Sequence, residues 1–241
     1  HGILHSFPTR RSSDLPTSDV NPHQSRPGRL RYLTEVDKAA IFEAALEIIG
    51  AVGMRVLHAG ARELLLAAGA TLHEGDVVTI PRELVERAWA AAPSVVEVFD
   101  RDGAHAMSLG GYNSYFGTGS DLMSTYDLET GEHRTSVLAD VARAARLCDA
   151  LPNIDFVMSC AHPNDIEPAR SYLESFRAMV ANTTKPMVMT SEHAGDLAVM
   201  CAVAEELRGG PEELAAKPYF IMYLEPVSPL SHPVESLDKL L

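Results

Sequence analysis

Short apolar runs recur at an almost constant interval in the second half of the chain. They span residues 154–160, 187–191 and 219–225, and stretches with helical spacing separate them. Strands that alternate with helices indicate βαβ units and a parallel sheet. Because the chemistry of such sheets lies at the carboxyl ends of the strands, the polar residues that end each run are the first candidates for a functional site.

Apolar residues at i, i+3, i+4 and i+7 spacing predict the helices that cover this sheet. One helix follows a cap at Thr135 or Ser136, and a second is opened by Pro168. A third begins at Asp196 and ends at Gly209. Each helix is therefore expected to pack one apolar face on the strands.

The first half of the chain predicts a helical region around one hairpin. Thr34 can cap the first helix, and Pro81 suits the first turn of the last one. A Glu-Gly-Asp turn within residues 71–80 indicates the hairpin. The predicted helices cover residues 33–52, 60–68 and 81–92. Two short strands are predicted next, at residues 95–99 and 105–109.

These elements predict an α/β fold, a partial TIM-type (β/α)8 barrel preceded by a helical cap region with a small β-hairpin. The cap is expected at residues 31–94 and the first half of the barrel at residues 95–241. A closed barrel needs about 250 residues, so we expect a chain truncated at its C-terminus. Residues 1–15 resemble a translated sequencing adapter, and residues 16–30 have the polar, Pro-rich composition of a disordered segment.

Composition narrows the range of partners. With 33 acidic and 20 basic residues the net charge is −13, and no Lys/Arg stripe is present to bind nucleic acid. No apolar run is long enough to span a membrane. Cys148, Cys160 and Cys201 form no CxxC pair and are odd in number, which argues against a disulfide framework. We therefore expect a cytoplasmic protein.

Four segments carry a resemblance to a known family. They are Asp-Leu-Glu-Thr-Gly-Glu-His-Arg at residues 127–134, residues 147–155, Asn-Thr-Thr-Lys-Pro at residues 182–186 and Glu-Pro-Val-Ser-Pro-Leu at residues 225–230. In order and spacing the chain resembles the trimethylamine methyltransferase family of corrinoid-dependent methyltransferases. The resemblance implies an α/β barrel that moves a methyl group from trimethylamine, or from a quaternary amine such as glycine betaine, to cobalt.

The resemblance also implies the partners. The methyl acceptor is a corrinoid (cobalamin) carried by a cognate corrinoid protein, with no cofactor bound directly. The substrate is a small methylated amine, and we expect neither nucleic acid nor membrane as a partner. A homo-oligomer is also expected, and a fragment of the enzyme would be inactive alone.

The expected chemistry selects the candidate residues. When a neutral amine leaves, acid or base help matters little, so the enzyme must align the nitrogen–methyl bond and exclude water. A quaternary ammonium is held by aromatic faces and nearby carboxylates. Candidates are therefore aromatic or acidic residues near strand ends, whereas the catalytic residues stay undetermined. The predicted substrate-binding residues are Tyr115, Phe116, Asp121, His162, Glu192, Tyr223 and Glu225.

Each candidate also has a purely structural interpretation. Tyr115 and Phe116 can be core aromatics, and Asp121 can cap a turn. Glu225 can hold its loop through a salt bridge, although Tyr223, two residues earlier on the same strand face, would share a pocket with it. The residues after the first apolar run, Asp165 among them, suit loop and cap positions.

Two other functions stay open from the sequence. A metal-dependent barrel hydrolase or lyase would draw its ligands from several strand ends, although no HxH or HExxH spacing occurs. Its candidate ligands are His162, Asp165, Glu192, His193 and Glu225. The other function is a non-catalytic barrel that only binds a quaternary amine.

Overall fold

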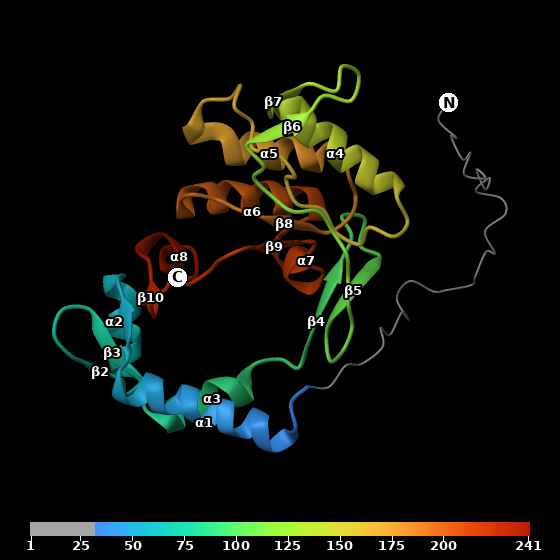
Figure 1. Ribbon diagram of the computed structural model, residues 1–241. Coiled ribbons are helices and arrows are strands. Elements are labelled where there is room, and N and C mark those ends of the chain that lie inside the picture. The colour runs from blue at the N-terminus through green and yellow to red at the C-terminus, as the bar shows by residue number, and fades with distance from the viewer. Residues whose placement is uncertain (1–31) are drawn as a thin grey trace, which may run out of the picture.

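The computed structural model describes residues 32–241. The interpretations of residues 1–15 and 16–30 therefore lie outside the described residues. The elements form an open arc in which α1 to α3 lie at the bottom and α4 to α6 at the top (Figure 1). The ribbon β4–β5 joins the two parts on one side, and β10 and α8 lie beside α2 on the other.

The cap region begins with α1 (Glu35–Ala51). Thr34 Oγ1 accepts a hydrogen bond from the Asp37 amide at 3.2 Å, and Asp37 Oδ2 accepts one from the Thr34 amide at 2.8 Å. This reciprocal pair satisfies two amides that a helix start leaves open, and it confirms Thr34 as the N-cap. At Gly53 a φ of 78° and a close approach to the Val78 carbonyl exclude any side chain.

The predicted hairpin and flanking helices are confirmed. Strand β2 pairs antiparallel with β3, and β3 pairs antiparallel with β1. The buried side chains of Val56, Ala61, Ala70 and Val78 form the cap core. The elements are β1 (Met54–Val56), α2 (Ala59–Ala67), β2 (Thr71–Leu72), β3 (Val77–Thr79) and α3 (Arg82–Ala91).

The end of the chain returns to this cap, which the sequence did not indicate. Strand β10 (Ser231–His232) pairs in parallel with β1, and Leu237 of α8 (Val234–Asp238) packs against the cap core. A strand of two residues has no periodicity to detect, so the pairing follows only from tertiary structure. The cap core therefore contains residues from both ends of the described chain.

Two antiparallel ribbons follow the cap. Strands β4 (Val95–Phe99) and β5 (His105–Gly110) pair where the sequence predicts two strands. Strands β6 (Ser124–Tyr126) and β7 (His133–Thr135) form a hairpin, and Asp127 closes its turn by donating from its amide to the Glu132 carbonyl at 2.8 Å.

Parallel pairing links four successive segments in their sequence order. Isolated bridges join Gly117 to Phe156 and Val157 to Met187, and β8 (Met187–Met189) pairs with β9 (Phe220–Met222). The run at residues 154–160 contributes only isolated bridges and not the continuous strand that its apolar pattern predicts. Sequential parallel order is what the first strands of a barrel would show, but closure of a barrel stays a prediction.

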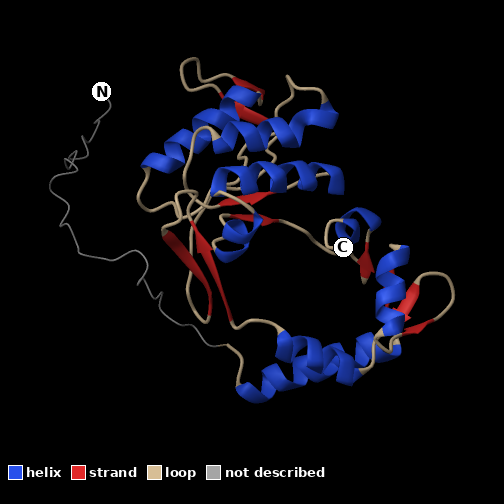
Figure 2. Cartoon of the chain, turned by 180° about the vertical axis from the view of Figure 1, so that it is seen from behind, coloured by secondary structure: helices blue, strands red, loops and turns tan. Residues whose placement is uncertain are grey.

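Helices cover one side of these strands, as Figure 2 shows from behind. Their buried faces share one core with β8, which includes Val141, Phe176, Met179 and Met200. The helical elements are α4 (Leu138–Ala150), η3 (Pro168–Arg170), α5 (Ser171–Val180), α6 (Ala194–Arg208) and α7 (Pro211–Ala216).

Two predicted helix starts are wrong. The N-cap of α4 is Val137, not Thr135 or Ser136, because Asp140 accepts the Val137 amide at 2.9 Å and the distant Asp165 accepts the Leu138 amide at 2.8 Å. Helix α6 begins two residues before Asp196, after His193 as its N-cap. Its end is confirmed, since Gly209 adopts a left-handed φ of 100°.

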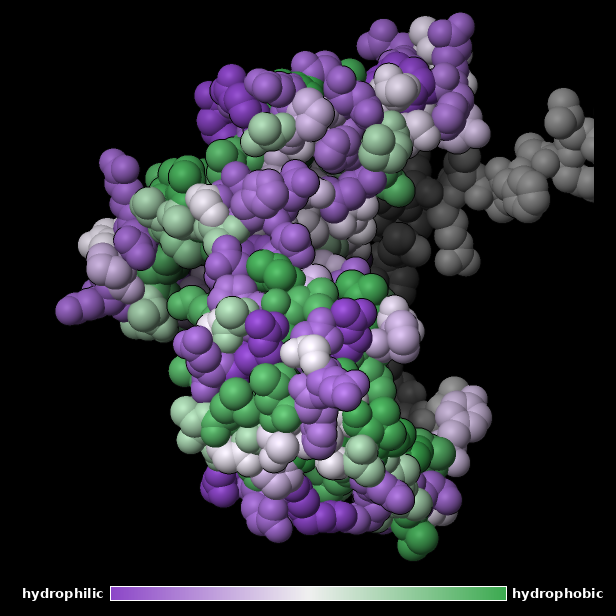
Figure 3. Space-filling view, turned by 90° about the vertical axis from the view of Figure 1, so that its left-hand side faces the viewer, coloured by the Kyte–Doolittle hydropathy of each residue, from purple (hydrophilic) through white to green (hydrophobic). Residues whose placement is uncertain are grey.

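Large apolar side chains lie exposed on the cap. In Figure 3 hydrophobic residues gather over the lower part of the molecule, where α1 to α3 lie. Val36, Ile41, Val52 and Trp89 are among the exposed apolar residues. None of the helices between residues 32 and 241 combines the length and apolar character needed to cross a lipid bilayer.

Candidate functional site

Asp121 lies near the carboxyl end of the first of the four parallel segments, and hydrogen bonds join it to the second and third segments. Its amide donates to Ser159 Oγ at 3.2 Å, and Ser159 Oγ donates to Asp121 Oδ1 at 3.2 Å. Thr190 Oγ1 donates to Asp121 Oδ2, also at 3.2 Å. One carboxylate thus connects three neighbouring segments at the edge where parallel sheets carry their chemistry.

The backbone at this edge is strained. Asp121 has a φ of 59° and Cys160 a φ of 61°, both in the left-handed region that favours glycine. Each such residue costs on the order of 1–3 kcal/mol, and such strain clusters at functional sites. The hydrogen bonds from Ser159 and Thr190 help to hold Asp121 in this conformation.

An aromatic pair lies within electrostatic range of this carboxylate. The rings of His162 and Tyr172 meet edge to face with their centroids 6.1 Å apart. Burial raises the pKa of the Tyr172 hydroxyl, and the negative charges of Asp121, Glu192 and Asp196 raise it further. The same three carboxylates make this region attractive to a cation, which an aromatic face can also hold.

A second pair lies at the end of β9. Tyr223 donates from its hydroxyl to Glu225 Oε2 at 2.7 Å, and this bond raises the pKa of Tyr223. The two residues therefore meet, as their spacing on one strand face predicts. Both side chains are exposed.

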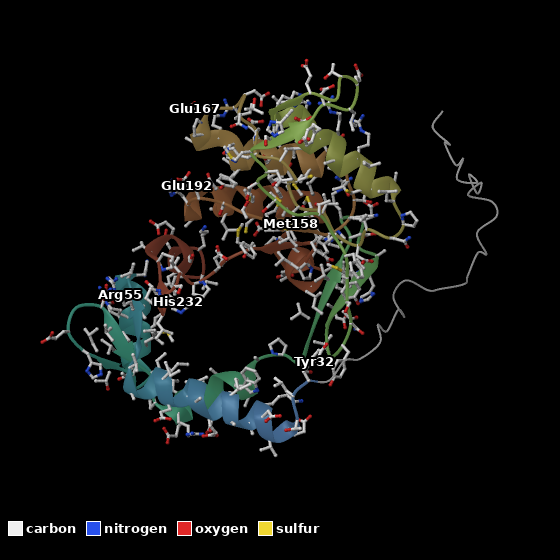
Figure 4. All side chains as sticks on the ribbon, in the orientation of Figure 1. Tyr32, Arg55, Met158, Glu167, Glu192 and His232 are labelled. Atoms are coloured by element: carbon white, nitrogen blue, oxygen red, sulfur yellow. The ribbon has the colours of Figure 1, made fainter. Side chains whose placement is uncertain are left out.

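The remaining candidates lie at different ends of the strands. Figure 4 shows Glu192 beside the start of α6 and above α8, on the same side of the molecule as Glu167. The Tyr115 hydroxyl instead accepts the Ser108 amide at 2.8 Å, and the Phe116 amide donates to Asp155 at 2.7 Å.

Tyr115 and Phe116 precede the first parallel bridge, at Gly117, whereas Asp121 follows it. The contacts of the two aromatics run to Ser108 and Asp155, whereas those of Asp121 run to Ser159 and Thr190. The structure therefore does not bring the two aromatics to Asp121.

Several residues of this site were not predicted from the sequence. Ser159 and Thr190 could have been suspected as polar residues at run ends. Tyr172 and Asp196 fall within stretches of helical spacing, where a polar or aromatic residue carries no special signal. Lys239 follows α8, and its Nζ donates to the carbonyl of Ser191, just after β8.

The structure does not bring the candidate metal ligands together. Between residues 32 and 241, no three His, Cys, Asp or Glu side chains lie close enough together to hold a metal ion. Asp165, one of the suggested ligands, instead accepts the amide of Leu138 at the start of α4. Asp165 therefore caps α4, a helix that begins 27 residues earlier in the sequence, and not the helix that follows Pro168.

A comparison with known protein families identifies the family of the chain. Residues 8–241 match the family model described as trimethylamine methyltransferase (MTTB). The chain belongs to the trimethylamine methyltransferase family. The match begins within residues 1–15, and the interpretation of that segment as an adapter stays a prediction.

Individual relatives show how much of the family's length is present. The chain is 30% identical over 192 residues to a trimethylamine methyltransferase MttB of Desulfitobacterium hafniense, covering 79% of this chain and 39% of that protein. It is 31% identical over 211 residues to MttB of Methanosarcina thermophila, covering 83% and 43%. A glycine betaine methyltransferase of Desulfitobacterium hafniense is 25% identical over 214 residues, covering 88% and 44%. The chain thus spans about two fifths of the length of these relatives.

Proposed function

We propose that this chain is the amine-binding part of a methyltransferase that passes a methyl group from a methylated amine to the cobalt of a corrinoid on a partner protein. The observation that carries the proposal is the Asp121 carboxylate, held by Ser159 and Thr190 within electrostatic range of Tyr172, whose ring packs against His162. The names of the relatives support it, since they act on trimethylamine or glycine betaine.

We also propose that the four parallel segments are the first strands of a (β/α)8 barrel. Their sequential order and the helices that cover them support this architecture. In such a barrel the carboxyl ends of the strands form the active face, where Asp121 and Glu225 lie. Location in the cytoplasm and a homo-oligomeric state stay predictions of the sequence.

The chemistry assigned to the described residues is binding and alignment. The negative charge of Asp121 attracts the ammonium group, and the ring of Tyr172 offers an apolar face to its methyl groups. The nitrogen–methyl bond breaks so that its electron pair stays on nitrogen, which leaves as an uncharged amine. The corrinoid supplies reduced cobalt as the methyl acceptor. Alignment toward that acceptor, with water excluded, is the contribution expected from the protein.

The test uses the protein encoded by the whole gene, purified and mixed with reduced cobalamin and either trimethylamine or glycine betaine. Methyl transfer is followed by the change in cobalt absorbance. We expect transfer with one of the amines, and Asp121→Asn to lower kcat/KM about 10- to 100-fold, the effect of losing one charged contact.

The matched control is Asp102→Asn, which removes the same charge at an exposed turn residue. Equal activity of the two variants would remove Asp121 from the site. Amine binding without any methyl transfer to cobalamin or to a corrinoid protein would instead support the non-catalytic binder.

A further inference from the structure

The hairpin formed by β6 and β7 begins three residues after Asp121, at the carboxyl edge of the parallel segments. Leu122 lies between them and makes a parallel bridge to Ala161. In Figures 1 and 2 the turn of the hairpin extends outward beyond α4. None of the residues that we propose to bind the amine belongs to this hairpin, so its exposed turn is left without a role.

Hydrogen bonds fix the base of the hairpin to the rest of the fold. The Asn164 side-chain amide donates to the carbonyls of Met123 at 3.0 Å and Ser136 at 3.1 Å, the residues that flank the hairpin. Arg134 of β7 donates to both carboxylate oxygens of Asp140 in α4, at 2.7 and 2.9 Å. A two-pronged contact of this kind fixes orientation as well as distance, so the hairpin is held firmly against α4.

Large apolar side chains lie exposed along this fixed hairpin. The Asp127 carboxylate holds the turn by accepting the amides of residues 129 and 130 at 3.0 and 3.2 Å. Leu128 projects from that turn and is 96% exposed. An apolar side chain on an ordered backbone loses little conformational freedom when a partner covers it, which favours binding. The other exposed apolar residues of the segment are Leu122, Met123 and Tyr126.

The charges around Leu128 indicate what kind of surface it fits. Glu129 and Glu132 are both exposed, and neither takes part in an ion pair between residues 32 and 241. Asp127 is instead paired with Arg134 at 3.0 Å. The turn therefore presents one apolar side chain between two uncompensated negative charges. Its complement is an apolar pocket with Lys or Arg side chains at the rim.

We propose that the β6–β7 hairpin docks the protein that carries the corrinoid, with Leu128 in an apolar pocket that has a basic rim. This inference rests on the proposed function, in which an amine held at Asp121 passes its methyl group to cobalt on a second protein. That protein must approach the carboxyl edge, and the hairpin extends outward from this edge three residues after Asp121. Because the base of the hairpin is fixed, docking on its turn also sets the position of the partner relative to the amine.

The other possible occupant is a later part of the same polypeptide, because the chain spans only about two fifths of the length of its relatives. The two occupants predict different results for Leu128→Asp. A hairpin packed inside the polypeptide would lose stability when Leu128 becomes charged, whereas a docking hairpin would lose only its affinity for the partner.

The experiment uses the protein encoded by the whole gene and the purified, cobalamin-loaded corrinoid protein of the same organism. Calorimetry gives the dissociation constant of the two proteins, and cobalt absorbance follows methyl transfer to free reduced cobalamin, which needs no docking. The matched control is Leu147→Asp, at a leucine of α4 that is 61% exposed. We expect Leu128→Asp to weaken binding of the corrinoid protein about 10- to 100-fold, as the loss of an interface anchor does, and to leave transfer to free cobalamin within about twofold.

The double variant Glu129→Gln, Glu132→Gln tests the charges. It should weaken binding about fivefold at low salt, and the difference from the wild type should shrink as salt is added. Leu147→Asp should bind like the wild type.

Three results would overturn the inference. They are unchanged binding of the corrinoid protein by Leu128→Asp, a lower Tm of Leu128→Asp than of Leu147→Asp, and a wild type that methylates free cobalamin but does not bind the corrinoid protein. A wild type that methylates neither free cobalamin nor the corrinoid protein would instead count against the proposed function itself.

Discussion

Lys185 holds the end of α4 through three hydrogen bonds, and its replacement is a sharp test of the fold. Its Nζ donates to the carbonyl oxygens of Cys148 at 2.7 Å, Leu151 at 2.6 Å and Ile154 at 2.7 Å. These carbonyls belong to the last turn of the helix and the connection to the next segment. A cation there also opposes the negative end of the helix dipole. Lys185→Met keeps the apolar stem and removes all three donors.

The expected loss of stability depends on which of the three hydrogen bonds are shielded from water. The bonds to Cys148 and Ile154 are partly buried, whereas water can replace the bond to Leu151. Two shielded bonds from a charged donor contribute about 3 kcal/mol or more. Burial lowers the pKa of Lys185, so part of this gain offsets desolvation. We expect a net loss of about 2 kcal/mol, or about 4–8 °C in Tm for a domain of this size.

The assay is urea unfolding followed by circular dichroism, with Lys38→Met as the matched control. Lys38 is exposed and pairs only with the neighbouring Glu35 on the surface of α1, so its loss should lie within measurement error. Equal stability of the two variants would refute the argument, because it would mean that water satisfies all three carbonyls after Lys185 is replaced.

Three further predictions concern packing, pH and thiol reactivity. Gly117→Ala should lower the free energy of unfolding, measured in urea, by about 1–3 kcal/mol, because a Cβ there would lie 2.5 Å from the Phe156 ring. The control Gly119→Ala adds its methyl group to open space and should leave the stability unchanged. Arg134 holds the pKa of Asp140 well below its ordinary value of 3.8, so the pair stabilises the fold above that pH. The stability difference between wild type and Arg134→Met should therefore shrink as the pH falls below 3.8, and a constant difference would contradict this. Burial raises the pKa of all three cysteine thiols, so mass spectrometry should show slower alkylation in the folded protein than in urea.

The elements that the sequence predicts well are those with local causes. The start of α1 depends on Thr34 and a partner three residues later, and the end of α6 depends on the left-handed Gly209. The start of α4 was predicted wrongly because one of its amides is satisfied from Asp165, which is 27 residues away from Leu138. Sequence spacing cannot reveal a partner that only the fold brings near.

The same distinction applies to the candidate site. Asp121 could be proposed because it is acidic and follows a glycine-rich stretch. Its partners Ser159 and Thr190 come from other segments, 38 and 69 residues along the chain, so no spacing in the sequence pairs them with Asp121. Phe116 lies only five residues from Asp121 in the sequence, and both are predicted to bind the substrate. In the structure the Phe116 amide is hydrogen-bonded to Asp155, whereas Asp121 is hydrogen-bonded to Ser159 and Thr190.

The end of the described chain returns to the cap. Strand β10 pairs with β1, Leu237 packs in the cap core, and Asp238 approaches His58 to 3.4 Å. The next residue, Lys239, reaches the carbonyl after β8. The cap and the carboxyl edge of the parallel strands are therefore joined through one short segment. The contacts of this segment with the cap thus help to position Lys239 at this edge, although none of the helices α1 to α3 carries a candidate site residue.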